Sequence, residues 1–469
     1  MGVAAKPRTI GELKAVGYRV LPVKAEMRRN LMAKMRKGEG LFPGIIGYED
    51  TVIPQIQNAI LAGQDIIFLG ERGQAKSRLI RALVNLLDEE VPIIAGCEIN
   101  DNPYKPLCRR CHEWVAQEGD AVEIEWIGRD RRYGEKLATP DITIADLIGE
   151  VDPIKVAEGR YLSDDLTIHY GLVPRHNRGI FCINELPDLA ERIQVGLFNI
   201  MEERDVQIRG YRIRLPLDIF LVASANPEDY TNRGRIITPL KDRYGAQIRT
   251  HYPHTLEHEI AIMEQERTRF EGEDERPLFI PSFIKEIVAE VVRQARRSPD
   301  INQRSGVSVR ASIASYESLL ANALRRAILL GEDVASPRIS DLPYIVPALM
   351  GKIEFETVEE GREEQVLDRL LQGAVLTVFN RYLTLSELEG VVAAFRGGLT
   401  VEVSDLAPVE AYQEIARQVP ALAEVAEKLA CVHPPQLLAS AIELVLEGLH
   451  LSKRLNKEKL ARRARYRAH

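Results

Sequence analysis

"DIIFLGERGQAKSRLIRALVNLL" (residues 65–87) joins a short apolar run, a glycine-containing loop and a segment with apolar residues at helical spacing. The loop fits the phosphate-binding consensus G-x-x-x-x-G-K-[ST] at Gly70, Lys76 and Ser77, but Ala75 replaces the second glycine. A strand before the loop and a helix after it are the context that this motif requires. We therefore predict that backbone N–H groups of the loop and of the helix N-terminus bind phosphate.

Within this loop we expect Lys76 to contact the β- and γ-phosphates of a nucleotide and Ser77 to ligate Mg²⁺. The other loop positions predicted to contact the nucleotide are Gly70, Gly73, Gln74 and Ala75. The alanine is tolerable where the helix has already begun and φ is negative, but it costs about 1–2 kcal/mol where the backbone is left-handed. The alternative interpretation of the whole loop is an ordinary turn between a strand and a helix.

Three more apolar runs have the length and composition of strands that are buried on both faces of a parallel sheet. They are "VPIIAGCEI" (91–99), "GIFCINE" (179–185) and "IFLVASANP" (219–227). Segments with helical periodicity lie between them, which is typical of an α/β fold. From about residue 253 the strand signal fades and helical spacing continues to the C-terminus, with "FRGGLTVEVSDL" (395–406) as the one strand-like exception.

Three polar residues stand at the ends of the second and third of these runs. Hydrolysis of a nucleotide by a phosphate-loop protein needs an acidic pair at the end of a second buried strand. Glu185 supplies one carboxylate, but Asn184 stands where an aspartate is expected, and Asn226 is placed to orient the attacking water. An amide brings no charge, so we expect ATP binding to survive and hydrolysis to be weakened. The alternative is a harmless variation, with Glu185 carrying the chemistry.

The order of several motifs resembles that of the AAA+ ATPases, in the branch that holds the MoxR proteins and the magnesium-chelatase I subunits. Besides the loop, they are "GIIGYED" (44–50), "NRGIFCINE" (177–185), "VQIRGYRIRLP" (206–216), "FLVASANP" (220–227), "LKDRYG" (240–245) and "GVSVRAS" (306–312). The resemblance covers about residues 41–320. Loops of MoxR type commonly carry alanine before the lysine, as this chain does at Ala75.

The resemblance implies a role for each matching residue. Lys76 and Ser77 belong to Walker A, Asn184 and Glu185 to Walker B, and Asn226 is sensor 1. It further implies that Arg243 is an arginine finger reaching into a neighbouring subunit and that Arg310 is sensor 2 on a helical lid. ATP and Mg²⁺ are the expected cofactors, and a ring of copies of this chain, a hexamer, is the expected assembly. Such fingers raise turnover by roughly 10³–10⁵ in other nucleotide hydrolases.

These patterns divide the 469 residues into four predicted parts. They are a basic N-terminal extension (1–40), an AAA+ α/β core (41–252) with a cysteine-containing insertion at about 96–128, an all-α lid domain (253–352) and a C-terminal helical region with a basic tail (353–469). Apolar runs are far shorter than the roughly 20 residues that span a bilayer. With no apolar signal segment near the N-terminus, we predict a cytoplasmic protein without a membrane span.

The cysteines suggest a metal site. Cys97, Cys108, Cys111 and His112 fall within sixteen residues, and thiolates at this spacing with an imidazole are suited to tetrahedral Zn²⁺. A redox pair of Cys108 and Cys111, or plain buried cysteines, are the alternatives. The remaining two, Cys182 and Cys431, are expected to be small core residues.

The leading hypothesis is an ATP-driven MoxR-type remodelling factor. Its partner would be a separate chain with a von Willebrand A domain, since no D-x-S-x-S motif is present here. The first alternative is the magnesium-chelatase ATPase subunit, which serves porphyrin metallation. The second is a nucleotide-gated scaffold with weak hydrolysis, for which Asn184 is the reason.

Both ends of the chain are basic. Residues 1–40 carry ten Lys and Arg against three Glu, and residues 451–469 carry eight against one. A nucleic-acid motor is therefore also possible but not favoured, because solvated basic tails explain the same charge.

Overall fold

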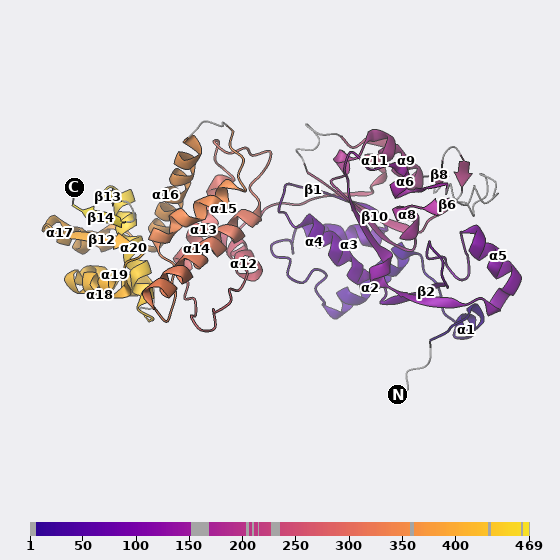
Figure 1. The fold of residues 1–469 in the computed structure, drawn as a ribbon, viewed down its shortest axis with the longest axis horizontal. Helices are drawn as coiled ribbons and strands as arrows, with labels where there is room; N and C mark the ends of the chain where they lie inside the picture. The colour runs from indigo at the N-terminus through magenta and orange to yellow at the C-terminus, as the bar shows by residue number, and fades with distance from the viewer. Residues whose placement is uncertain are drawn as a thin grey trace. The chain divides into compact units, whose positions relative to one another are not determined.

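The computed structural model describes residues 6–151, 168–202, 206–208, 211–213, 215–226, 235–356, 361–429, 433–460 and 463–468. Cys431 lies outside them. The chain forms two compact units, residues 1–251 and residues 252–469 (Figure 1). Among the described residues, no helix is long and apolar enough to cross a membrane.

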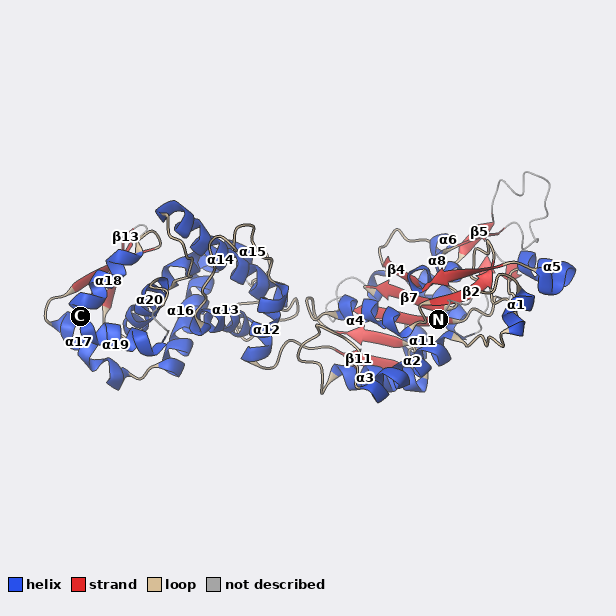
Figure 2. Ribbon diagram, turned by 90° about the horizontal axis from the view of Figure 1, so that it is seen from below, coloured by secondary structure: helices blue, strands red, loops and turns tan. Residues whose placement is uncertain are grey.

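A five-stranded parallel sheet forms the centre of the first unit. Its order is β11-β1-β10-β7-β4. The strands are β1 (Ile66–Leu69), β4 (Tyr133–Leu137), β7 (Gly179–Asn184), β10 (Ile219–Ala225) and β11 (Ala246–Arg249). The predicted α/β class is confirmed, and the strands lie between helices in Figure 2.

Each central strand is apolar throughout because both of its faces are covered. Ile66 and Phe68 of β1 pack with residues of α2 (Val23–Lys37), α3 (Val52–Ala62) and α4 (Lys76–Ala82). Ile67 points to the other face and packs with residues of α9 (Glu191–Glu202) and α11 (Thr238–Arg243). Alternate side chains of a strand point to opposite faces, so an unbroken apolar run fits a sheet between two helical layers.

The run "VPIIAGCEI" is a strand, but it is not part of the parallel sheet. It forms β2 (Glu90–Ile94), which pairs antiparallel with β3 (Ile124–Gly128). The edge position next to β7 belongs to β4, whose sequence "YGEKL" is polar. The apolar run is explained by a separate cluster in which Val91 and Ile93 of β2 pack with Ile127 of β3.

The remaining elements of this unit are short. The helices are α1 (Ile10–Ala15), α5 (Arg109–Glu118), α6 (Ile144–Leu147) and α8 (Leu172–Arg175). The strands are β5 (Gly149–Val151) with β6 (Ile168–Tyr170), and β8 (Val206–Ile208) with β9 (Tyr211–Ile213). Both strand pairs are antiparallel, and the motif "VQIRGYRIRLP" contains β8 and β9.

The basic N-terminal segment is folded against the core. Glu26 of α2 and Arg132, which immediately precedes β4, form a bidentate ion pair with N–O distances of 2.7 and 2.6 Å. Their side chains are only 3% and 1% exposed. The carboxylate also accepts the Asp88 N–H at 2.6 Å, and Arg132 Nε donates to the Arg178 carbonyl at 2.7 Å. This pair therefore joins α2 to the edge of the sheet.

The second unit is helical, as predicted. Its helices are α12 (Leu256–Glu266), α13 (Ser282–Ala295), α14 (Val309–Leu330), α15 (Val346–Met350), α16 (Arg362–Tyr382), α17 (Glu389–Arg396), α18 (Val409–Gln418), α19 (Pro420–Leu429) and α20 (Gln436–Leu451). One hydrophobic core runs through them, and α13 packs against α16 across the predicted division at residues 352 and 353. The second unit is therefore one packed body.

The basic C-terminal segment is part of a small sheet. β12 (Thr400–Ser404), the expected strand, pairs with β14 (Arg463–Arg467), which pairs with β13 (Asn456–Leu460). Arg465 lies 2.7 Å from the Glu402 carboxylate, and Lys457 lies 2.7 Å from Glu447. Much of the positive charge at this end is thus paired within the unit.

The buried ion pair generates a prediction. Arg132→Met leaves the Glu26 carboxylate buried without its partner, so we expect the unfolding free energy of the first unit to fall by about 3–5 kcal/mol. Both tryptophans of the chain, Trp114 and Trp126, lie in this unit, so their fluorescence during urea unfolding reports on it.

Adding Glu26→Gln to this variant should recover much of the loss, because no charge is then left unpaired. Glu113→Gln, which breaks the exposed Arg109–Glu113 pair, is the matched control and should change little. If Arg132→Met lowers the unfolding free energy no more than Glu113→Gln does, the assigned role of the buried pair is wrong.

Candidate functional site

The candidate site lies where three neighbouring strands of the parallel sheet end. β10 lies between β1 and β7, so the residues that follow these strands meet at one edge. The phosphate loop follows β1, Asn184 and Glu185 stand at the end of β7, and Asn226 follows β10. The Gly70 N–H donates to the Ala225 carbonyl at 3.2 Å, which fixes the start of the loop against β10.

Lys76 is the first residue of α4, and its ammonium group is buried inside the loop. The residue is 8% exposed. Its Nζ donates to the Glu71 carbonyl at 2.8 Å, to the Gly70 carbonyl, and to Asn226 Oδ1 at 2.6 Å. A buried cation satisfied by carbonyl oxygens is held at the place where an anion would be attracted.

Asn226 connects this lysine to Glu185. Its Oδ1 accepts from Lys76, and its Nδ2 donates to Glu185 Oε2 at 2.7 Å. The Glu185 N–H in turn donates to the Ser224 hydroxyl at 3.3 Å. The structure therefore brings together three of the predicted site residues in one chain of hydrogen bonds.

Two residues of the site have strained backbones. Ala75 has φ +56° and ψ +16°, and Glu185 has φ +56° and ψ +46°. Ala75 therefore does not have the negative φ that would make an alanine tolerable at this position. The helix begins one residue later, at Lys76. Left-handed conformations of non-glycine residues concentrate at functional sites, where the surrounding structure maintains them.

Side chains outside the motif brace the loop. A Cβ atom on Gly70 would lie 1.9 Å from Thr250 Oγ1, so only glycine fits there. The same hydroxyl donates to Gln74 Oε1 at 2.7 Å. The Tyr48 hydroxyl lies 2.9 Å from the Gln74 carbonyl and 2.8 Å from the His251 carbonyl, and burial raises the pKa of Tyr48 to about 12. The tyrosine thus remains a neutral donor at physiological pH.

Asn184 has a partner that the sequence did not indicate. Its Nδ2 donates to Glu135 Oε1 of β4 at 2.5 Å, and its Oδ1 accepts from the Ser224 hydroxyl at 3.0 Å. Glu135 also forms two hydrogen bonds with the Arg81 guanidinium, at 2.9 and 3.0 Å. The pairing with Arg81 lowers the pKa of the Glu135 carboxyl, so this group is ionised at neutral pH.

This contact gives a physical reason for the amide at position 184. An aspartate there would bring a second carboxylate to within hydrogen-bond distance of Glu135, and two carboxylates in such contact repel each other. Asparagine instead donates a hydrogen bond to the carboxylate. The negative charge at this corner of the site stands on β4, where Arg81 balances it.

Of the remaining predicted nucleotide-site residues, Gly73 is half-buried in the loop and three others are at the surface. Ser77 is exposed in the first turn of α4. Arg243 is the exposed last residue of α11, with its guanidinium 5.5 Å from the Phe198 ring. Arg310 is exposed in the first turn of α14, in the second unit. The roles of these three residues stay predictions.

The predicted metal-binding cysteines converge. Ligand atoms of Cys97, Asp101, Cys108 and Cys111 all lie within 4.8 Å of one another, and all four residues are buried. His112 is exposed on α5 and is not part of this group. Asp101 therefore occupies the fourth place in this group that was expected for His112.

The cluster favours negative charge on one sulfur. Hydrogen bonds from the Cys108 and Cys111 thiols lower the pKa of Cys97. Burial, together with the nearby charge of Cys97, raises the pKa of Asp101 to about 6. By contrast, Cys182 packs in the core beside β10, as expected.

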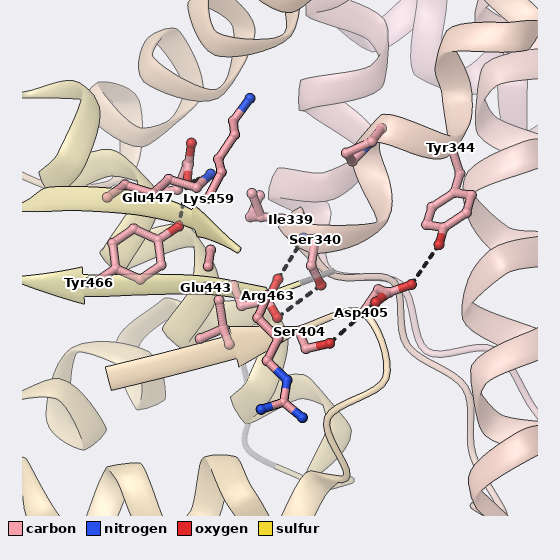
Figure 3. Close-up of a pocket in the computed structure, with 14 residues that line it drawn as sticks. Ile339, Ser340, Tyr344, Ser404, Asp405, Glu443, Glu447, Lys459, Arg463 and Tyr466 are labelled. Carbon is pink, nitrogen blue, oxygen red and sulfur yellow. Dashed lines mark hydrogen bonds and ion pairs between the residues drawn. The ribbon is translucent and has the colours of Figure 1, made fainter. Parts of the chain in front are cut away.

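A pocket of about 330 Å³ lies in the second unit, between α20 and the small sheet (Figure 3). The buried Glu443 accepts from the Ser340 N–H at 2.6 Å, from the Ser340 hydroxyl at 3.0 Å and from the Tyr412 hydroxyl. Burial raises the pKa of Glu443. Glu447 is paired with Lys457. Both glutamates thus have hydrogen-bond or ion-pair partners within the unit, and these contacts hold α20 against its neighbours.

Known proteins resemble the chain at modest identity. No family model matches it. The magnesium-chelatase subunit ChlI of Nostoc sp. is 24% identical over 356 residues, which are 70% of this chain and 89% of that protein. The ChlI homolog of Methanocaldococcus jannaschii is 29% identical over 217 residues, 44% of this chain and 53% of that protein. A solved complex between subunits BchI and BchD of magnesium chelatase has 21% identity and a TM-score of 0.35, covering 70% of this chain and 98% of that one.

The phosphate loop at the edge of a parallel sheet, with a lysine, an asparagine and a glutamate in contact, defines a P-loop nucleotide-binding protein. The sequence relatives agree with this fold. The chain has the α/β core and helical second unit of an AAA+ protein and is similar in sequence to the magnesium-chelatase ChlI subunits.

The strained alanine generates a prediction. Ala75→Gly should raise the unfolding free energy of the first unit by about 1 kcal/mol, because glycine adopts a positive φ without the steric penalty. Ala82→Gly, at a position with φ −67° on the same helix, is the matched control and should lower it by about 0.5–1 kcal/mol. Equal changes in both variants, measured by tryptophan fluorescence in urea, would show that position 75 carries no strain.

The contact between Asn184 and Glu135 generates another. Asn184→Asp should destabilise the first unit at neutral pH by about 1–3 kcal/mol, through a lost hydrogen bond and a new repulsion. The loss should shrink as the pH falls, because protonation of one carboxyl removes the repulsion.

Glu135→Gln combined with Asn184→Asp should be more stable than the sum of the two single changes predicts. Additive effects in this double-mutant cycle would show that the two side chains do not interact.

Proposed function

We propose that this chain binds Mg-ATP at the loop of Lys76 and hydrolyses it slowly. The observation that carries the proposal is the chain of contacts from Lys76 through Asn226 to Glu185. Lys76 would compensate the charge of the phosphates, Asn226 would orient the attacking water, and Glu185 would accept its proton. Mg²⁺ would supply charge stabilisation, held by the phosphates and the Ser77 hydroxyl.

The present partners of Lys76 show what nucleotide binding would change. Its ammonium is bound to carbonyl oxygens of its own loop and to the Asn226 amide. A triphosphate offers more strongly accepting oxygens, so Lys76 would exchange these partners for phosphate. Asn226 would then lose one partner and keep Glu185, which links occupancy of the loop to the position of the catalytic carboxylate.

Slow hydrolysis follows from the amide at position 184. The carboxylate nearest to it, Glu135, is already paired with Arg81. Less negative charge therefore remains near the expected Mg²⁺ than an aspartate at 184 would provide. Glu185 keeps its own role, so we propose reduced turnover and retained binding.

We further propose that the active form is a ring, a hexamer, in which Arg243 of one copy completes the site of the next. Its exposure at the end of α11 supports this, since a side chain that acts on a neighbouring copy must be accessible. On the helical unit, Arg310 would contact the nucleotide as sensor 2. The ring would work in the cytoplasm as a MoxR-type remodelling factor on a separate protein with a von Willebrand A domain.

A second candidate function is that of the magnesium-chelatase ATPase subunit. The names of the relatives favour it, since matches to chelatase subunits extend over 65–70% of this chain. A nucleotide-gated scaffold is the third, favoured by Asn184. A nucleic-acid motor is disfavoured because basic residues near both ends, such as Lys24 and Arg465, pair with acidic groups of the same unit.

The test is Mg-ATP turnover by the full chain as its concentration rises. We expect turnover per chain to increase cooperatively with concentration, because each site needs a neighbouring copy. Glu185→Gln should bind ATP with unchanged affinity and lose at least 10²-fold in turnover, consistent with removal of a general base.

Lys76→Ala should lose ATP binding itself. Cys182→Ser, which changes a thiol buried in the sheet, is the matched control and should retain both ATP binding and turnover. If the wild type binds ATP but turns it over no faster than Glu185→Gln does, the motor function is wrong and the nucleotide-gated scaffold is favoured. Added porphyrin substrate and chelatase partner subunits would separate the chelatase function from remodelling.

A further inference from the structure

The buried group of three thiols and a carboxylate lies outside the nucleotide site. Cys97 and Asp101 follow β2, whereas Cys108 and Cys111 stand at the start of α5. Their ligand atoms lie within 4.8 Å of one another. In a tetrahedral zinc site with Zn–S bonds of about 2.3 Å, neighbouring sulfurs are about 3.8 Å apart. A contraction of less than about 1 Å would thus complete the tetrahedron.

The backbone around the group is arranged as at a metal site. The Asp101 N–H points to Cys97 Sγ at 3.4 Å, and the Cys111 N–H points to Cys108 Sγ at 3.4 Å. N–H groups directed at sulfur stabilise thiolates. The Asp101 carboxylate accepts the N–H groups of Leu107 and Cys108, each at 3.0 Å, which fixes its orientation. Each carboxylate oxygen keeps a second lone pair for a metal.

The helix that begins at these cysteines is anchored mainly through one side. Of the ten residues of α5, Cys111 is the only fully buried one, while Trp114 and Val115 pack partly buried against the core. The chain between β2 and α5 contains neither helix nor strand. A helix with one fully buried residue gains only part of its stability from hydrophobic burial, and a bound metal would add to it.

We propose that Cys97, Cys108 and Cys111, with one carboxylate oxygen of Asp101, bind a structural Zn²⁺ ion. The ion fastens α5 and the preceding loop to the end of β2. Three thiolates and one oxygen in a closed, buried set suit zinc, because sulfur ligands select soft metals and four protein ligands leave no open position. This site is independent of nucleotide hydrolysis.

The first test is the metal content of the full chain purified without chelator. We expect one zinc per chain, and Cys111→Ser should reduce this to near zero. Cys182→Ser, a buried thiol outside the cluster, and His112→Ala, the exposed neighbour, should both keep one zinc. A wild type with no zinc after reconstitution, or a Cys111→Ser variant with full zinc, would overturn the proposal.

The second test identifies the fourth ligand. Asp101→Asn should weaken zinc binding about 10-fold or more. With Co²⁺ in place of zinc, Asp101→Cys should raise the thiolate-to-metal absorption per bound ion by about a third, because four thiolates replace three. Unchanged absorption in Asp101→Cys would show that position 101 does not ligate the metal.

A third measurement addresses the structural role and separates it from misfolding of variants. Removal of zinc from the wild type by a chelator should increase hydrogen exchange at the amides of α5 and leave that of α9 unchanged. Re-addition of Zn²⁺ should restore the protection. Exchange at α5 that does not respond to zinc would contradict the role as a fastener.

Discussion

The candidate nucleotide site depends on one buried cation. The ammonium group of Lys76 lies under its own loop and binds two loop carbonyls and Asn226, so the end of β1 is tied to the end of β10. Asn226 then extends the tie to Glu185 at the end of β7. Since a buried charge is costly without partners, this arrangement requires that the three strands keep their order and register. It also sustains left-handed backbones at Ala75 and Glu185.

The charges near this cation give a reason for the asparagine at position 184. A carboxylate on β4, Glu135, occupies the corner where an aspartate at position 184 would stand, and Arg81 balances it. The amide at 184 is therefore a consequence of its neighbour. Away from the site, the buried pair of Glu26 and Arg132 joins α2 to the start of β4, the edge strand of the sheet. Electrostatic contacts thus contribute to the first unit alongside apolar packing.

Sequence patterns predicted those elements that have a regular local pattern of apolar residues. The loop, the strands β1, β7 and β10, and the long helices α13 and α14 were visible because buried elements carry an apolar pattern of the right period. Strand β4 was missed because a polar edge strand has no such pattern, and the polar strands β13 and β14 were missed for the same reason.

Contacts between distant residues were out of reach for local patterns. The apolar run of β2 was assigned to the wrong sheet, because an apolar pattern does not name the strand it pairs with. Glu135 is 49 residues from Asn184, so nothing local links them. Asp101 was within reach: it lies between Cys97 and Cys108, and a search that included carboxylates among the metal ligands would have found it.

In the proposed ring, a second copy of the chain completes each nucleotide site. The most direct measurement mixes two variants, Arg243→Ala and Glu185→Gln, each slow on its own. In a mixed assembly, a copy with intact Glu185 can stand beside a copy with intact Arg243. The account predicts that mixing restores a substantial part of Mg-ATP turnover. If the two variants assemble together and turnover stays at the level of either alone, the site is not shared and the account is wrong.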